Sequence, residues 1–190
     1  MAVHSGDYEH WAKIAFIAGL ADRHWGNYAL YCETIDADRQ AQQWRKLLNK
    51  VWEYLAGQLS SMKNLEKALL QLEPLTPEPT DEDNYGIYPA LDACLLLTSA
   101  LQMILDDSID DTETAAELSK ATVAQFIALS EGLDEFDPQS HQHELYDQEL
   151  AWQAHLVKNT HARQPNADIV KQLRRDLADF DSSNLGIALK

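Results

Sequence analysis

Apolar residues recur at steps of three and four along most of the chain, which is the spacing of one face of an α-helix. The clearest stripe extends over about four turns, and polar side chains such as Arg45 and Lys50 take the opposite face. Its members are Trp44, Leu47, Leu48, Val51, Trp52, Leu55 and Leu59. A shorter stripe with the same spacing runs from Leu65 to Leu72 and stops before Pro74. The pattern therefore predicts two amphipathic helices in succession.

Helices are also predicted in most of the remaining chain. The first covers about residues 7–21 with Ser5 or Asp7 as its cap, and a short one around Tyr28 follows a break at Gly26. The three C-terminal helices are expected to begin at Thr114, after Pro138 and at Pro165. Thr114 and Glu117 have the spacing of a capping box, which favours a helix start at the threonine.

One predicted helix, at about 89–106, is apolar on nearly every face. It follows residues 74–88, which contain three prolines and should form a loop, and Pro89 suits its first position. A helix without a polar face is expected at the centre of a bundle. No segment alternates with period two as a strand does. The sequence therefore predicts an all-α fold, in which residues 1–190 form a single-domain irregular bundle of about eight helices around a central apolar helix.

Length and cysteine content are consistent with one domain in a reducing compartment. A chain of 190 residues is long enough to bury about 70% of its unfolded surface. Cys32 and Cys94 lie in apolar helical stretches without metal-ligand spacing, which favours two buried thiols. No export signal is recognised before Asp7, and the charge-free stretch from Ala93 to Leu105 is too short to cross a membrane. A cytoplasmic location is expected, with no membrane association.

The formal net charge of −16 is concentrated in the middle of the chain. Residues 75–150 hold 18 acidic side chains and one basic side chain, Lys120, whereas the flanking segments are nearly balanced. A negative field of this kind repels phosphate backbones, so nucleic-acid binding is not expected and a basic protein partner is favoured. The alternative is that the charges only keep the protein soluble. The first interpretation predicts one continuous acidic face.

The segment Tyr-Gly-Ile-Tyr-Pro-Ala-Leu-Asp-Ala-Cys at 85–94 resembles the signature of the DUF416, or YjaG-like, family of Gram-negative bacteria. Supporting matches are Asn-Tyr-Ala-Leu-Tyr-Cys at 27–32, Val-Trp-Glu at 51–53 and Ser-Asn-Leu-Gly-Ile at 183–187, so the resemblance covers nearly the whole chain. It implies an all-helical fold and a link to histidine-kinase signalling. It assigns no catalytic residues, activity or cofactor.

Residues 106–110 match the DDxxD pattern with which helical prenyl synthases bind magnesium and diphosphate. That chemistry also needs a second acidic motif and basic residues for the diphosphate, and only Lys120 is basic in this third of the chain. The aspartates are therefore interpreted as part of a connection between helices. The alternative function is a magnesium-dependent hydrolase acting on a phosphorylated small molecule. Its metal ligands would be Asp106, Asp107, Asp110 and Asp111. His141 and His143, near Glu144, lack the spacing of a metal motif and are interpreted as solvated surface residues.

Asp92 is an acid one turn into the apolar central helix, close in sequence to Tyr85 and Tyr88. One interpretation is structural, with the carboxylate accepting local hydrogen bonds near a helix start. The other makes Asp92 the polar anchor of a ligand pocket walled by Tyr85, Tyr88 and Tyr28. The sequence leaves both open.

The expected function is a non-enzymatic interaction or regulatory role, associated with signalling through the family resemblance, with an acidic face for a basic partner. No cofactor or metal is expected, and the oligomeric state is open between monomer and homodimer. The apolar segment Leu185–Leu189 is expected to lie across the bundle or to pair with another subunit, the first being favoured.

Overall fold

The computed structural model describes residues 5–80, 83–160 and 167–188. Its α-helices are α1 (Ser5–Arg23), α2 (Trp25–Thr34), α3 (Asp38–Leu55), α4 (Met62–Leu72), α5 (Ile87–Leu105), α6 (Thr112–Glu131), α7 (Glu144–Thr160) and α8 (Ala167–Ala178). Two short 3₁₀ helices are η1 (Glu73–Leu75) and η2 (Pro138–Gln142). The described residues contain no strand beyond one isolated bridge between Ser182 and Ala188. The predicted all-α class is therefore confirmed.

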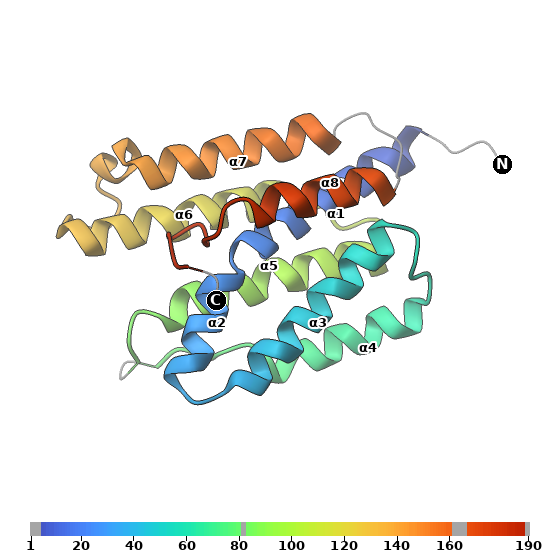
Figure 1. The fold of residues 1–190 in the computed structure, drawn as a ribbon, viewed down its shortest axis with the longest axis horizontal. Coiled ribbons are helices and arrows are strands. Elements are labelled where there is room, and N and C mark those ends of the chain that lie inside the picture. The colour runs from blue at the N-terminus through green and yellow to red at the C-terminus, as the bar shows by residue number, and fades with distance from the viewer. Residues whose placement is uncertain (1–4, 81–82, 161–166, 189–190) are drawn as a thin grey trace.

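The helices form two outer groups around a central pair (Figure 1). Helices α6, α7 and α8 lie on one side, α2, α3 and α4 on the other, and α1 and α5 run between them. The predicted central helix is α5, which packs against α1, α2, α4 and α6. Helix α1 is equally central, because every residue from Trp11 to Arg23 except Lys13 is buried. The predicted packing around α5 is therefore confirmed, with α1 buried beside it.

Three helix starts differ from the predicted ones. The predicted break at Gly26 is wrong, because α2 begins at Trp25 and contains Gly26. Helix α5 begins at Ile87 and not at Pro89, after a turn in which the Asn84 side-chain oxygen accepts a hydrogen bond from the Gly86 amide at 2.9 Å. Pro89 still lies in the first turn, where a missing N–H removes no intrahelical bond. Helix α6 begins at Thr112, so the predicted capping box is wrong. The start of α1 at Ser5 precedes the side chains that the structure describes, so its predicted cap stays a prediction, as does the start of α8 at Pro165, which lies outside the described residues.

The C-terminal segment, residues 182–188, lies across the bundle, as the favoured interpretation predicted for the tail that starts at Leu185. Leu189, the last residue of the predicted tail, lies outside the described residues. Leu185 is buried in a small apolar cluster with Val123 of α6. Asn184 donates its backbone N–H to the Arg23 carbonyl at 3.1 Å, and its side-chain oxygen accepts from the Asn27 amide at 2.8 Å. These contacts join the segment to the point where α1 meets α2.

Helix α5 is long and apolar enough, by length and composition, to span a membrane, and no other helix of the described part passes this test. In the fold, 61% of its apolar window is buried against other helices, a property that core helices share. Cys32 and Cys94 are buried free thiols. Burial raises the pKa of Cys32 to about 11 and that of Cys94 to about 12, which keeps both protonated near neutral pH.

Candidate functional site

Two of the predicted tyrosines meet in an open groove between the start of α5 and the end of α6. The ring centroids of Tyr85 and Tyr88 are 6.2 Å apart, and the Tyr85 ring lies 6.4 Å from that of Phe126. The groove has a volume of about 450 Å³ and is lined by Tyr85, Tyr88, Gln125, Ala128, Leu129, Leu133 and Glu135. We call it the tyrosine groove. Helix α6 ends at Gly132, whose left-handed backbone (φ 65°) lets the Leu133 N–H donate to the Ala128 carbonyl at 2.8 Å, so Leu133 stays next to the helix end.

Large apolar side chains remain exposed around the tyrosine groove. Leu129 is 60% exposed and Tyr88 is 44% exposed. Phe136 is 79% exposed and lines a second hollow of about 200 Å³ on the neighbouring side of α6, where Gln125 is shared with the groove. Phe136 also has a left-handed backbone (φ 66°), a conformation that costs energy for a bulky residue. Exposed apolar residues gathered in one place mark an interaction surface more than scattered ones do.

Asp92 does not line this groove. It is partly buried on the side of α5 that faces α6, where the Thr122 hydroxyl donates a hydrogen bond to its carboxylate at 2.8 Å. Burial raises the pKa of Asp92 to about 6, although the Thr122 bond acts in the opposite direction. Burial, with a contribution from the Asp92 charge, also raises the pKa of Tyr85 to about 12. The geometry supports the structural interpretation of Asp92, as a polar link between the two helices.

Tyr28 does not belong with the other two tyrosines, so the prediction that placed it in their pocket is wrong. Its side chain is completely buried, and its ring is stacked on Trp44 with centroids 5.4 Å apart. The hydroxyl donates to the Leu75 carbonyl at 2.7 Å, and burial raises the pKa of Tyr28 above its usual range. Tyr28 thus lies on the buried face of α2, where its hydroxyl holds the residues that follow α4.

The four aspartates of the predicted metal site lie in the connection from α5 to α6. The Asp106 carboxylate accepts bonds from the amide and hydroxyl of Ser108, and Asp110 accepts the corresponding pair from Thr112. Lys13 donates to Asp110 at 2.8 Å, and these donors lower the pKa of Asp110 to about 2. Asp107 is exposed, and the backbone of Asp111 forms the cap position of α6. Two carboxylates of the connection, those of Asp106 and Asp110, therefore stabilise turns, and Asp110 also forms an ion pair with Lys13.

No group of three His, Cys, Asp or Glu side chains suited to a metal ion occurs in the part of the chain that the structure describes. His141 stacks on Tyr146 with ring centroids 4.4 Å apart, and His143 Nδ1 accepts the Leu145 amide at the start of α7. The two histidines thus have local roles at one end of the molecule.

The acids of residues 75–150 do not form one continuous face, which corrects the prediction. Those between α5 and α6 lie at one end of the bundle, whereas those between α6 and α7 lie at the other end (Figure 1). A helix of 20 residues separates the two groups, a distance of roughly 30 Å. Glu149, by contrast, is buried within α7.

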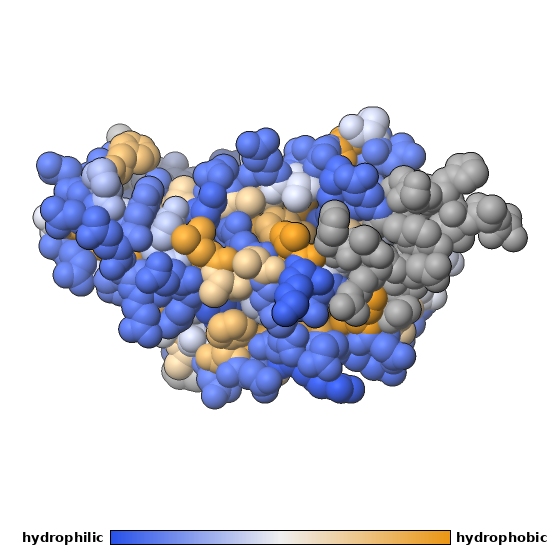
Figure 2. All heavy atoms as spheres, turned by 90° about the horizontal axis from the view of Figure 1, so that it is seen from above, coloured by the Kyte–Doolittle hydropathy of each residue, from blue (hydrophilic) through white to orange (hydrophobic). Residues whose placement is uncertain are grey.

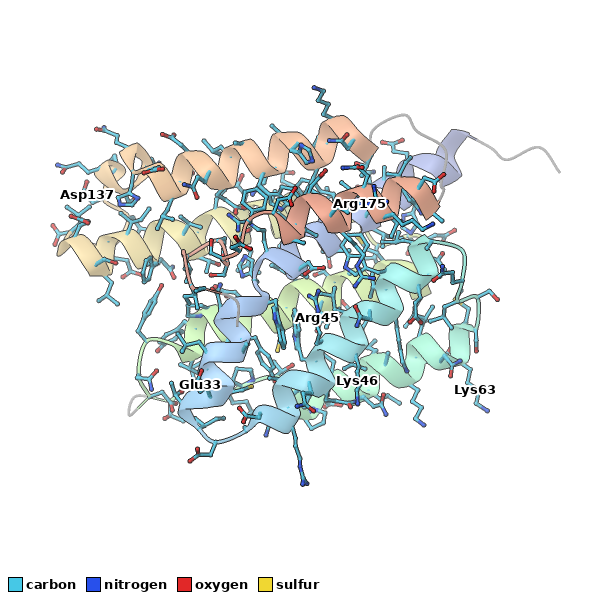
Figure 3. All side chains as sticks on the ribbon, in the orientation of Figure 1. Glu33, Arg45, Lys46, Lys63, Asp137 and Arg175 are labelled. Carbon is cyan, nitrogen blue, oxygen red and sulfur yellow. The ribbon has the colours of Figure 1, made fainter. Side chains whose placement is uncertain are left out.

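We call the group at the α6–α7 connection the acidic end. It comprises Glu131, Asp134, Glu135, Asp137, Glu144 and Asp147. None of the ion pairs found among the described residues involves these six carboxylates. Hydrophilic residues cover most of this end in Figure 2, and Asp137 marks it in Figure 3. Glu135 belongs to the acidic end and also lines the tyrosine groove, so the two features adjoin.

Sequence reasoning missed Leu129, Leu133 and Phe136. Leu129 lies near the end of α6 and is exposed, although it is a large apolar residue of that helix. One signal pointed to Leu133 and Phe136, since the stretch from Gly132 to Pro138 places these two apolar residues among three acids, between two turn-forming residues.

Taken together, these features define an acidic all-α bundle with an apolar groove at one end. The family model described as "Protein of unknown function (DUF416)" matches residues 6–188, so the chain belongs to the DUF416 family. The protein YjaG of Escherichia coli K12 is 30% identical over 94% of this chain and 91% of its own length. YjaG of Salmonella typhimurium is 31% identical with the same coverage. The crystal structure of a DUF416 family protein from Shewanella baltica is 28% identical, covers 100% of both chains and superposes with a TM-score of 0.79.

Proposed function

We propose that this protein is a binding protein whose acidic end and tyrosine groove capture a basic segment of a partner protein. The observation that carries the proposal is that six carboxylates, which have no ion-pair partner in the described part of the chain, adjoin an open apolar groove, with Glu135 belonging to both. Lysine or arginine side chains of the partner would meet the carboxylates. An apolar side chain of the same segment would enter the groove between Tyr88 and Leu129.

Charge and apolar contact have separate roles in this proposal. At about 0.15 M salt the screening length is about 8 Å, so charges clustered on one connection act together whereas those at the far end of α6 do not. Such a field accelerates and orients encounter. The apolar anchor supplies most of the affinity, because interface energy is concentrated in a few buried side chains.

The proposal places the protein in the cytoplasm and gives it a regulatory role that needs no cofactor. It is supported by the two protonated buried thiols, which suit a reducing compartment. The magnesium-dependent hydrolase is not favoured by a specific observation, since Asp106 and Asp110 already accept hydrogen bonds from neighbouring residues.

The test uses a fluorescent lysine-rich peptide with one leucine, together with the same peptide in which alanine replaces the leucine. We expect affinity for the leucine peptide to fall at least tenfold between about 50 and 200 mM salt, because several charges are screened at once. Asp134→Asn with Glu135→Gln should weaken binding about tenfold. The matched control, Asp107→Asn with Glu113→Gln, removes the same charge from exposed positions at the opposite end and should have little effect.

The groove is tested separately with Leu129→Ala. This side chain is 60% exposed, so its loss should leave the fold intact while abolishing the preference for the leucine peptide over the alanine peptide. Affinity that does not depend on salt, or that falls equally in the control pair, would refute capture at the acidic end. A leucine preference that survives Leu129→Ala would refute the role of the groove.

A further inference from the structure

A pocket on the other side of the molecule has the opposite charge character. It lies where the α1–α2 junction, α3 and α8 meet, and its volume is about 400 Å³. Three arginines line it: Arg23 from α1, Arg45 from α3 and Arg174 from α8. Figure 3 labels Arg45 on α3, and Arg175, the neighbour of Arg174, on α8. Three guanidinium groups around one hollow are unexpected in a chain with a formal net charge of −16.

Only one of the three arginines has a carboxylate partner within the described part of the chain. Arg45 Nη1 pairs with Asp22 at 2.5 Å, and Asp22 also accepts the Trp52 indole N–H at 2.8 Å. Arg174 donates to the neutral Asn49 side chain at 2.9 Å. Arg23 donates to the Ser182 carbonyl. The remaining acid in the lining is Asp181, so the pocket keeps an excess of positive charge.

Arg23 is the most unusual member, because it is only 3% exposed. Its guanidinium packs on the Phe180 ring, 3.8 Å from the centroid, and its Nε has no hydrogen-bond partner among the described residues. Burial lowers the pKa of Arg23 to about 10, although the charge of Glu149 acts in the opposite direction. Arginine remains charged at neutral pH even so. A buried cation without an ion-pair partner is costly, and an anion in the pocket would remove that cost.

We propose that this pocket binds a small molecule through an oxyanion, a phosphate or carboxylate group held by Arg23, Arg45 and Arg174. Guanidinium groups present planar pairs of N–H donors that match the oxygens of both anions. The volume suits a small-molecule ligand, and Trp25 supplies an apolar wall. The site is distinct from the acidic end, so it is independent of the proposed capture of a basic segment.

A ligand bound in this pocket would also contact the start of the C-terminal segment. Asp181 and Ser182 belong to the lining, and the Arg23 bond to Ser182 ties the pocket to the residues that follow α8. A ligand that contacts all three arginines would hold α3, α8 and the α1–α2 junction together. Ligand binding to the native state alone raises the melting temperature by mass action.

The test titrates inorganic phosphate, pyrophosphate and malonate into the full chain, with sodium chloride at equal ionic strength as reference. We expect saturable heat and a melting-temperature increase with at least one of these anions. Phosphate or pyrophosphate would identify a phosphate group, and malonate a carboxylate. Arg174→Gln should weaken binding about tenfold, since it removes a charged donor from an exposed position. Arg175→Gln, which removes the same charge one residue away and outside the lining, should not change it.

A third variant must strengthen binding. Asp181→Asn removes the opposing charge from the lining, and asparagine tolerates the left-handed backbone found there (φ 52°). We expect several-fold tighter binding, a gain that a damaged fold would not produce. The proposal is overturned if no anion saturates beyond the chloride reference. It is equally overturned if Arg174→Gln and Arg175→Gln lose the same affinity, or if Asp181→Asn fails to gain.

Discussion

Gly19 of α1 lies so close to Leu156 of α7 that a β-carbon at position 19 would be 2.5 Å from Leu156 Cδ2. The Trp152 indole, one turn earlier on α7, donates to the Gly19 carbonyl at 3.3 Å across the same contact. Leu156 is completely buried, so its side chain has little space to move away. The absence of a side chain at residue 19 therefore allows α7 to lie this close to α1.

Gly19→Ala is accordingly expected to destabilise the protein. Overpacking a core typically costs 1–3 kcal/mol, and the better helix propensity of alanine returns about 1 kcal/mol. We expect the free energy of unfolding to fall by up to about 2 kcal/mol in urea denaturation. In a Leu156→Ala background the obstacle is gone, and Gly19→Ala should become neutral or stabilising. An equal cost in both backgrounds would show that the close approach is not the cause.

Asp92 gives a pH-dependent prediction. Its folded-state pKa of about 6 is higher than the ordinary value of 3.8, so the folded protein binds the proton more tightly than the unfolded chain. Its contribution to stability is therefore greatest below pH 4 and decreases as the pH rises to about 6. Asp92→Asn keeps an oxygen that accepts from Thr122 and removes the charge. At pH 7.5 we expect the variant to be more stable than the wild type by about 1–2 kcal/mol.

The measurement is the free energy of unfolding of both proteins at pH 4 and pH 7.5. The advantage of Asp92→Asn should be present at pH 7.5 and absent at pH 4. Asp107→Asn, which removes an exposed carboxylate, serves as the control. A large loss of stability at pH 7.5 would contradict the assignment of Asp92 as a carboxylate that burial disfavours.

Tyr28 and Tyr88 should respond differently to the same substitution. Tyr28→Phe removes the hydroxyl that binds the Leu75 carbonyl and leaves that carbonyl with only the weak Cys94 thiol donor, which should cost about 1–2 kcal/mol of stability. Tyr88 is 44% exposed, so Tyr88→Phe should change stability by less than about 0.5 kcal/mol. The measurement is the free energy of unfolding of the two variants and the wild type by chemical denaturation. Equal effects would argue against separate structural and surface roles for these tyrosines.

Much of the fold could be predicted because the periodic stripes match helices that bury one face. The predicted stripe from Trp44 to Leu55 is the buried face of α3, whereas Leu59, its last predicted member, lies beyond the end of that helix. Helix boundaries were less predictable, since they depend on single side chains: Asn84 binds the Gly86 amide ahead of α5, and Asp110 binds the Thr112 amide at the start of α6. Such bonds compete with the capping pattern that the sequence displays.

The candidate sites were less accessible to sequence reasoning. Tyr85 and Tyr88 are close in sequence and could be grouped, but the other wall of their groove comes from α6 and depends on how two helices pack. Arg23, Arg45 and Arg174 are far apart along the chain, and none stands in a recognisable motif. Tyr28 was misplaced because it stands in a short helix whose buried face could not be read from so few residues.

The fastening of residues 182–188 to the α1–α2 junction has a consequence for synthesis. Asn27 emerges from the ribosome about 157 residues before its partner Asn184. At synthesis rates of about 5–20 residues per second, this interval is roughly 8 to 30 s. Throughout it, Asn27 lacks the Asn184 side chain, and the arginine-lined hollow lacks the wall that Asp181 and Ser182 form. A nascent chain of this protein can therefore pack α1 against α3, α5, α6 and α7 before it can close the α1–α2 junction, which makes this junction one of the last parts of the fold to form.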